Sequence, residues 1–367
     1  MNQSHRIHFL DNLRAFVIML VVVLHGSISY MAYPPDWWYV LDTHNSLSFT
    51  RLVLLIDVPI MPIMFFIAGY FALPSLFKRG PNEYMKDRFI RVGAPWLVGA
   101  LLLAPPTAYM TYFSRGVPMS FLQFWASDFW TVAYQQSVYW FLGVLLFFFI
   151  LLVLAYGISE RLRTAKRQVS MPTWKLFVWF WAIMSPAMFL MNQFFSAEAW
   201  YTRNYILVFQ PVRLPLYVGY FGLGIYAHLR GWFSAEGYKP RLLPWAVVWL
   251  ISGLLYLGNR LSVMLTSQVA YAILFNAFCL SSLLAGAALF QQKVNQSSPF
   301  WNRASANSYG IYYIHPLILY PLAYFFVPVS LPLSVKAPLV ILLGISLSWA
   351  VSALVLTKAP ILRRVFG

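Results

Sequence analysis

The chain has 367 residues, of which 60% are hydrophobic and only 10% are charged, and its mean hydropathy is positive at +0.66. This composition excludes an ordinary soluble globular protein and predicts an all-α polytopic membrane protein. The formal net charge of +16 would suit nucleic-acid binding in a soluble chain. Here the basic residues lie in short segments between apolar runs, so we expect no nucleic-acid partner and a chain surrounded by membrane lipid.

Ten apolar runs are long enough to cross a membrane as helices. In chain order they are residues 13–33, 52–77, 92–112, 138–157, 174–194, 205–229, 243–258, 268–290, 308–327 and 337–357. Most of the 26 lysines and arginines lie on alternate connections, as expected for cytoplasmic loops. The sequence therefore predicts about ten transmembrane helices with cytoplasmic N- and C-termini, in a single integral-membrane domain over residues 1–367. Both a monomer and a homo-oligomer are compatible with the sequence.

The first run lies within FLDNLRAFVIMLVVVLH and joins Arg14 to His25. In an α-helix these eleven steps turn by about 1100°, within about 20° of three full turns, and rise about 16 Å. Arg14 and His25 therefore share one face, separated along the helix axis. A histidine inside a membrane-crossing helix is a candidate functional residue.

The second run carries Asp57 near its outer end, at a depth similar to that of His25. We predict that the two side chains meet, with the carboxylate orienting the imidazole. The alternative is a contact that only holds two helices together.

Two further ionisable residues lie inside predicted spans. Arg213 stands between Pro211 and Pro215, so it lines a break in a helix, and an anionic ligand or Asp57 would satisfy its buried charge. His315, in IYYIHP, suits either a structural role at a kink or a catalytic role.

The third run begins with two arginines, Arg88 and Arg91, spaced i and i+3. Side chains at this spacing project to one side of a helix, so the pair predicts an anion site, although ordinary anchoring of a cytoplasmic loop explains such arginines as well. Glycines and prolines, among them Pro95 and Pro105, predict that this span is kinked or broken.

The predicted outer loops, residues 34–51 and 113–137, are rich in Trp and Tyr beside carboxylates and amides. Single rings at this depth are typical interfacial anchors, but together they also suit a surface that stacks on sugars.

Four motifs in this order resemble the integral-membrane acyltransferase 3 family. They are the Arg14-to-His25 spacing within FLDNLRA and VVLH, FFIAGYF at Phe65 to Phe71, RFIRVGAPW at Arg88 to Trp96, and YWFLGVLLFF at Tyr139 to Phe148. IYYIHP is also similar to the second histidine motif of the family. Within it the chain looks most like the succinyl-transferring enzymes that modify periplasmic glucans. Many members carry an additional soluble domain after the last span, which this sequence does not show.

The resemblance implies transfer of an acyl group, of acetyl or succinyl type, from cytoplasmic acyl-CoA to a hydroxyl of a glycan or lipid-linked saccharide. The acceptor would stand on the periplasmic side of a bacterial inner membrane. His25 matches the essential histidine of the family and Arg14 its partner arginine, whereas Arg88 and Arg91 match the pair linked with the nucleotide end of CoA.

We therefore predict His25 as general base, oriented by Asp57, with Arg14 completing the catalytic set. We predict that the CoA phosphates dock on Arg88, Arg91 and Arg14. Contacts to the other substrate are assigned to Arg213, His315 and Trp140.

We expect no metal site and no tightly bound cofactor, since acyl-CoA acts as a co-substrate. An acyl-histidine intermediate stays open. The competing function is a secondary transporter or flippase, because buried charges and a broken helix also occur there, but no internal repeat is visible. A membrane scaffold is a third alternative.

Overall fold

The computed structural model describes residues 7–262 and 267–366, so both ends of the predicted 1–367 domain lie outside the described residues. The described chain forms helices joined by loops, which confirms the all-α membrane class. Among the described residues, eight helices are long and apolar enough to cross a membrane. These are α1 (His8–Ile28), α2 (Leu47–Arg79), the helix Pro81–Ser114, the helix Ser137–Ile158 that contains α7 (Trp140–Ile158), α9 (Trp174–Phe194), α11 (Leu242–Leu261), α12 (Gln268–Lys293) and the helix Leu333–Leu356 that contains α14 (Leu333–Val351).

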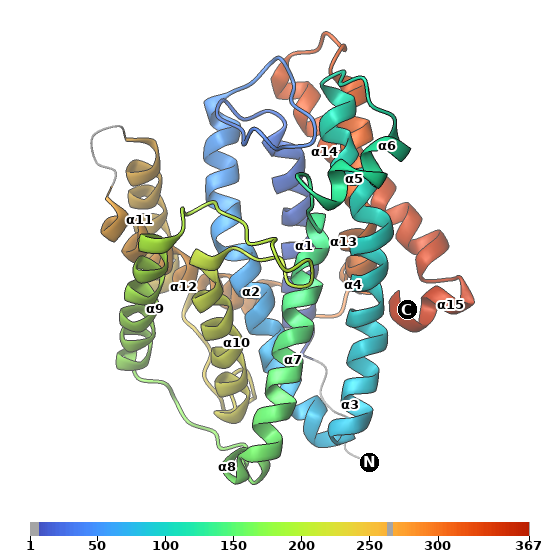
Figure 1. The fold of residues 1–367 in the computed structure, drawn as a ribbon. Helices are drawn as coiled ribbons and strands as arrows, with labels where there is room; N and C mark the ends of the chain where they lie inside the picture. Colours follow the sequence, from blue (N-terminus) through green and yellow to red (C-terminus); the bar gives the residue numbers. More distant parts are fainter. Residues whose placement is uncertain (1–6, 263–266, 367) are drawn as a thin grey trace.

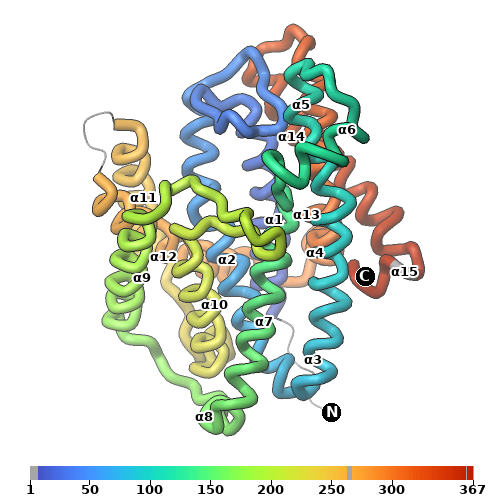
Figure 2. The backbone as a smooth tube through the Cα atoms, viewed as in Figure 1, coloured from blue at the N-terminus to red at the C-terminus, as the bar shows by residue number. Residues whose placement is uncertain are grey.

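The other two predicted spans differ from expectation. In the run 205–229 only α10 (Leu214–Leu229) is α-helical, and it follows a short 3₁₀ turn, Pro211–Arg213. Proline lacks the amide hydrogen that a helix interior needs, so Pro211 and Pro215 stand at the start of helical structure instead. Figures 1 and 2 show α10 beginning partway along the bundle, where the loop from α9 crosses.

The tenth element, α13 (Pro299–Phe326), is long but not among the eight apolar helices. Its first half carries polar side chains, among them Asn302, Arg303 and Asn307. These lower its hydropathy although its second half is apolar.

The third predicted span is continuous rather than broken. It runs through α3 (Pro81–Arg88), α4 (Ala94–Val98) and α5 (Ala104–Ser114), joined by two π-helical stretches, Phe89–Gly93 and Gly99–Leu103. Each π-helical stretch lies just before a proline position, which is where the helical hydrogen-bond ladder loses a donor.

Helix α1 occupies the middle of the bundle, in contact with α2, α12, α13 and α14 (Figure 1). Helices α2 and α10 pack backbone to backbone: a Cβ added at Gly69 would stand 2.0 Å from the Phe221 carbonyl oxygen. A Cβ at Gly224 would stand 2.1 Å from the Phe66 carbonyl oxygen. Only glycine permits this approach, so α10 is seated closely on α2.

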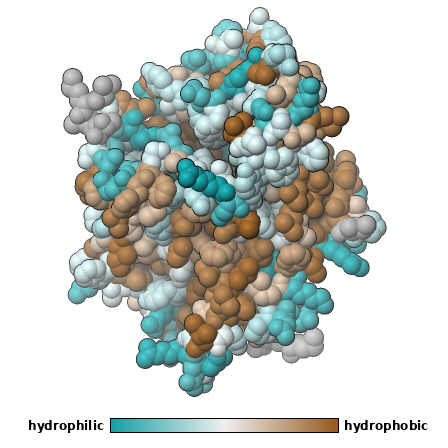
Figure 3. Space-filling model, in the orientation of Figure 1, coloured by the Kyte–Doolittle hydropathy of each residue, from teal (hydrophilic) through white to brown (hydrophobic). Residues whose placement is uncertain are grey.

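The bundle has two distinct ends, which we call the α3 end and the α6 end. The α3 end also carries α8 (Glu160–Arg163), and the α6 end carries α6 (Phe121–Ala126) and the loop 29–46 (Figure 1). Hydrophobic side chains cover much of the middle of the visible face, and hydrophilic ones gather toward the ends (Figure 3). This distribution suits a helical bundle that spans a membrane.

Two cations hold the loop 29–46. Lys336 Nζ of α14 lies 2.7 Å from Asp42 Oδ2, and these side chains are 0% and 2% exposed. Arg115, just after α5, donates to the carbonyl oxygens of Asp36 at 2.6 Å and of Trp38 at 3.0 Å. The loop is thereby tied to both α14 and α5.

Candidate active site

The centre of the site is a contact between two histidines from helices far apart in the sequence. His25 Nδ1 of α1 lies 2.8 Å from His315 Nε2 of α13, and the rings are nearly parallel at 11°. His315 is fully buried, whereas His25 keeps part of its surface exposed to neighbouring cavities. The ring of Trp38, from the loop 29–46, lies 5.7 Å from that of His25.

The second nitrogen of His315 determines the hydrogen-bond direction. His315 Nδ1 lies 2.7 Å from the carbonyl oxygen of Tyr312, which can only accept, so this nitrogen carries a hydrogen. In a neutral His315, Nε2 is then the acceptor, and His25 Nδ1 is the donor between the rings. A neutral His25 is left with a free lone pair on Nε2, which is the form that a general base needs.

Asp57 does not orient His25 as predicted. Among the described residues, it pairs instead with Arg213, whose Nη2 lies 2.5 Å from Asp57 Oδ2. The sequence had offered Asp57 as one partner for this guanidinium, and that alternative is confirmed. A buried cation is costly without a counterion, so the carboxylate is drawn to Arg213, and His315 takes the position beside His25.

Three cavities follow one another through the bundle. The arginine cavity, of about 530 Å³, is lined by Arg14, Arg88 and Arg91. The histidine cavity, of about 490 Å³, is lined by His25, Asp57, Arg213 and Trp140. The loop cavity, of about 590 Å³, lies under the outer loops of the α6 end.

Neighbouring cavities share wall residues. Phe141 and Tyr312 line both the arginine cavity and the histidine cavity. His25, Trp38 and Trp140 line both the histidine cavity and the loop cavity. His25 therefore lies at the boundary between the histidine cavity and the loop cavity.

The predicted anion-binding arginines do lie around one cavity. Arg88 is held firmly there: it donates to Ser75 Oγ at 3.1 Å, and its guanidinium stacks at 4.8 Å on Tyr84 and 4.9 Å on Phe149. Arg91 Nε lies 3.3 Å from Asp87, a carboxylate also paired with Arg79. Part of the arginine charge is thus already neutralised within the protein.

The loop cavity has the aromatic and amide character that the outer loops predicted. Its lining includes Trp37, Trp38, Tyr134 and Gln136. Burial raises the pKa of the Tyr39 phenol, so this group stays protonated and donates to Gln135 Oε1 at 2.6 Å. Flat rings beside amides suit the faces and hydroxyls of a saccharide.

Several residues of the site have no assigned role in the sequence analysis. Tyr312 orients His315 through its carbonyl, Phe141 forms part of a cavity wall, and Lys336 pairs with Asp42. Of these, only the pair of Lys336 and Asp42 could have been predicted from the sequence, because the two residues carry opposite charges at the same predicted depth.

Comparison with known proteins identifies the family. The acyltransferase domain of the acyltransferase 3 family matches residues 7–357, which is nearly the whole chain. The chain belongs to this family. As an acyltransferase 3 protein it is a multi-pass membrane acyltransferase that uses an acyl donor and an acceptor. This decides between the function classes, in favour of the enzyme over the transporter and the scaffold.

The curated relatives of this acyltransferase 3 protein match over a shorter stretch. The chain is 32% identical over 163 residues to the glucans biosynthesis protein C of Escherichia coli (strain K12), and equally to that of Shigella dysenteriae serotype 1 (strain Sd197). The alignment covers 44% of this chain and 40% of each relative. No solved structure matches.

Proposed function

We propose that the protein transfers an acyl group from cytoplasmic acyl-CoA to a hydroxyl of a glycan or lipid-linked saccharide on the periplasmic side of a bacterial inner membrane. In this proposal the single domain has ten spans and cytoplasmic termini, with α10 and α13 as the two spans beyond the eight apolar helices. The enzyme needs no tightly bound cofactor. The glucan-related name of the partial relatives supports a glycan acceptor.

The observation that carries the proposal is the place of His25 on the wall between the histidine cavity and the loop cavity. The acceptor hydroxyl enters through the loop cavity, and the thioester arrives from the arginine cavity. His25 Nε2 takes the hydroxyl proton while the oxygen attacks the thioester carbonyl. The carbon–sulfur bond then breaks, and the leaving thiolate receives the proton from His25, giving an ester and free CoA.

The arginines that line the histidine cavity also favour a succinyl group over an acetyl group. Arg213 and Arg260 bring two guanidiniums to this cavity, and each pairs through Nη2 with one carboxylate, that of Asp57 and that of Glu198 respectively. Both residues line the cavity beside His25. A succinyl group would place its distal carboxylate against such guanidiniums, whereas an acetyl group leaves them unused.

The test uses the full chain, reconstituted with labelled succinyl-CoA or acetyl-CoA and a glucan acceptor. We expect label in the glucan, more from succinyl-CoA, and loss of transfer in His25→Ala. His44→Ala removes an exposed histidine of the outer loop and should keep full activity. Transfer by His25→Ala at the wild-type rate would reject the assigned base, and equal use of both donors would reject the succinyl preference.

A further inference from the structure

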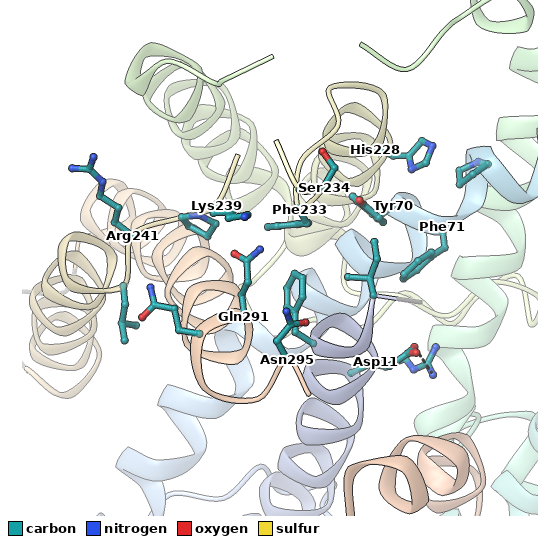
Figure 4. A pocket seen from close by; sticks show the side chains of 18 of the residues that line it. Asp11, Tyr70, Phe71, His228, Phe233, Ser234, Lys239, Arg241, Gln291 and Asn295 are labelled. Carbon is teal, nitrogen blue, oxygen red and sulfur yellow. Dashed lines mark ion pairs between the residues drawn. The ribbon is translucent and has the colours of Figure 1, made fainter. Parts of the chain in front are cut away.

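A large cleft opens at the α3 end, apart from the three cavities of the proposed reaction. The basic cleft, as we call it, has a volume of about 1880 Å³. Its walls come from the first turns of α1, from α2, from the ends of α10 and α12, and from the loop that precedes α11 (Figure 4). This volume is several times that of the arginine cavity, so it can admit a far bulkier group.

Uncompensated positive charge lines this cleft. Four cationic side chains, Arg14, Arg167, Lys239 and Arg241, line it, against one carboxylate, Asp11, which lies 3.3 Å from Arg14. Within the described part of the chain, no carboxylate lies within 4.0 Å of the charged nitrogens of the other three cations. Arg88 and Arg91 of the arginine cavity, by contrast, share Asp87. Phosphate oxygens would therefore find more available cations in the cleft.

The neutral side chains of the basic cleft suit a nucleoside. Figure 4 shows Phe233 on one side, with Gln291 and Asn295 facing it across the cleft. Phe71 contributes a second ring toward α1. Phe233 is only 7% exposed and packs on Phe9 at 5.1 Å, so Phe71 is the more accessible ring that can stack on a purine base. The amides can donate to and accept from the polar edge of the base.

The basic cleft adjoins the arginine cavity through a shared wall. Arg14 and Phe71 line both spaces, so one elongated ligand can occupy the two at once. The distance from Arg14 to His25 along α1, about 16 Å, is then left for a linear arm.

We propose that the basic cleft binds the adenosine 3′-phosphate 5′-diphosphate half of acyl-CoA, with Arg167, Lys239 and Arg241 as phosphate ligands. The pantetheine arm continues past Arg14 into the arginine cavity, so this proposal replaces the expected placement of the CoA phosphates on Arg88 and Arg91. The identity of this donor rests on the proposed function. A phospholipid headgroup shares the phosphate chemistry, but it offers no base for Phe71 and the amides.

The test measures binding of CoA and of adenosine 3′,5′-bisphosphate to the full chain in nanodiscs of neutral lipid. Replacing both exposed cations in Lys239→Ala with Arg241→Ala should weaken binding of both probes at least tenfold, since charged hydrogen bonds to phosphate are lost. The matched control is Arg161→Ala with Lys175→Ala, which removes two exposed cations of the same end that do not line the cleft. The control should keep wild-type affinity.

Each outcome has a distinct meaning. Wild-type affinity in the cleft variant, or no binding of either probe to the wild type, would overturn the proposal. Displacement of both probes from the wild type when phosphatidylglycerol is added to the discs would overturn the nucleotide assignment in favour of a lipid headgroup. A third outcome is that CoA binds to the wild type and binds more weakly to the cleft variant, but no acyl group is transferred to any glycan. The proposed function then fails and the assignment of the cleft stands.

Discussion

The two ends of α1 hold their functional side chains in opposite ways. His25 is fixed through His315 to a backbone carbonyl oxygen of α13, and Trp38 covers it. The Arg14 side chain is 38% exposed and pairs with Asp11 on the same helix. The proposed base is thus held in one geometry, whereas the proposed anion-binding arginine can adjust to its ligand. This difference is expected if only His25 takes part in the chemistry.

The largest effect on activity should come from removing the imidazole of His25, at the fixed end of α1. His25→Ala is expected to lower kcat for acyl transfer by roughly 10²- to 10⁴-fold, because the general base is removed. Adding His315→Ala to this variant should cause almost no further loss, since His315 acts through His25. Steady-state rates of the single and double variants measure this. A further tenfold drop in the double variant would give His315 an independent role.

The second effect concerns the buried pair beside His25. Arg213→Met leaves Asp57 without its cation and should lower the free energy of unfolding by about 3 kcal/mol. The matched variant Arg213→Met with Asp57→Leu should recover most of that loss, because no charge is left unpaired. Reversible unfolding in mixed micelles gives both values. Equal destabilisation in the two variants would show that the ion pair itself is what stabilises this region.

A smaller effect is expected from His315→Phe, which tests whether His315 orients His25 or binds acyl-CoA. His315→Phe keeps a ring but removes the acceptor for His25 Nδ1, so His25 populates both tautomers. We expect kcat to fall about tenfold to a hundredfold, within the range for proton-transfer groups, with the KM for acyl-CoA unchanged. A rise in KM at constant kcat would contradict a positioning role.

The smallest effect on activity should come from replacing Arg14, at the adjustable end of α1. Arg14→Ala is expected to raise the KM for acyl-CoA about threefold to tenfold at constant kcat, because a half-exposed cation contributes about 1 kcal/mol to anion binding. Arg88→Ala is the informative comparison, since it also removes the stacking on Tyr84 and Phe149 and should lower the melting temperature. An unchanged melting temperature in Arg88→Ala would indicate that this stacking adds little.

Local spacing could predict the face of α1, and the cost of an unpaired guanidinium could predict the contact of Arg213 with Asp57. The partner of His25 could not be predicted in this way, because His315 lies 290 residues away and its role depends on how α13 packs against α1. The shortened α10 had a signal in Pro211 and Pro215, but an average of hydropathy over the run conceals it. Sequence reasoning therefore succeeds where a single helix or a strong charge decides, and fails where packing chooses between partners.

Tyr312 belongs to two structures at once. Its ring forms part of the partition between the arginine cavity and the histidine cavity, its hydroxyl donates to the Val138 carbonyl oxygen, and its own carbonyl oxygen accepts from His315. A thioester that displaces this ring while passing would also disturb the hydrogen bond that sets the imidazole tautomers. In the proposed reaction, passage of the thioester and proton transfer at His25 would then be coupled through Tyr312. A replacement of this ring that admits longer acyl chains would therefore also alter the histidine pair.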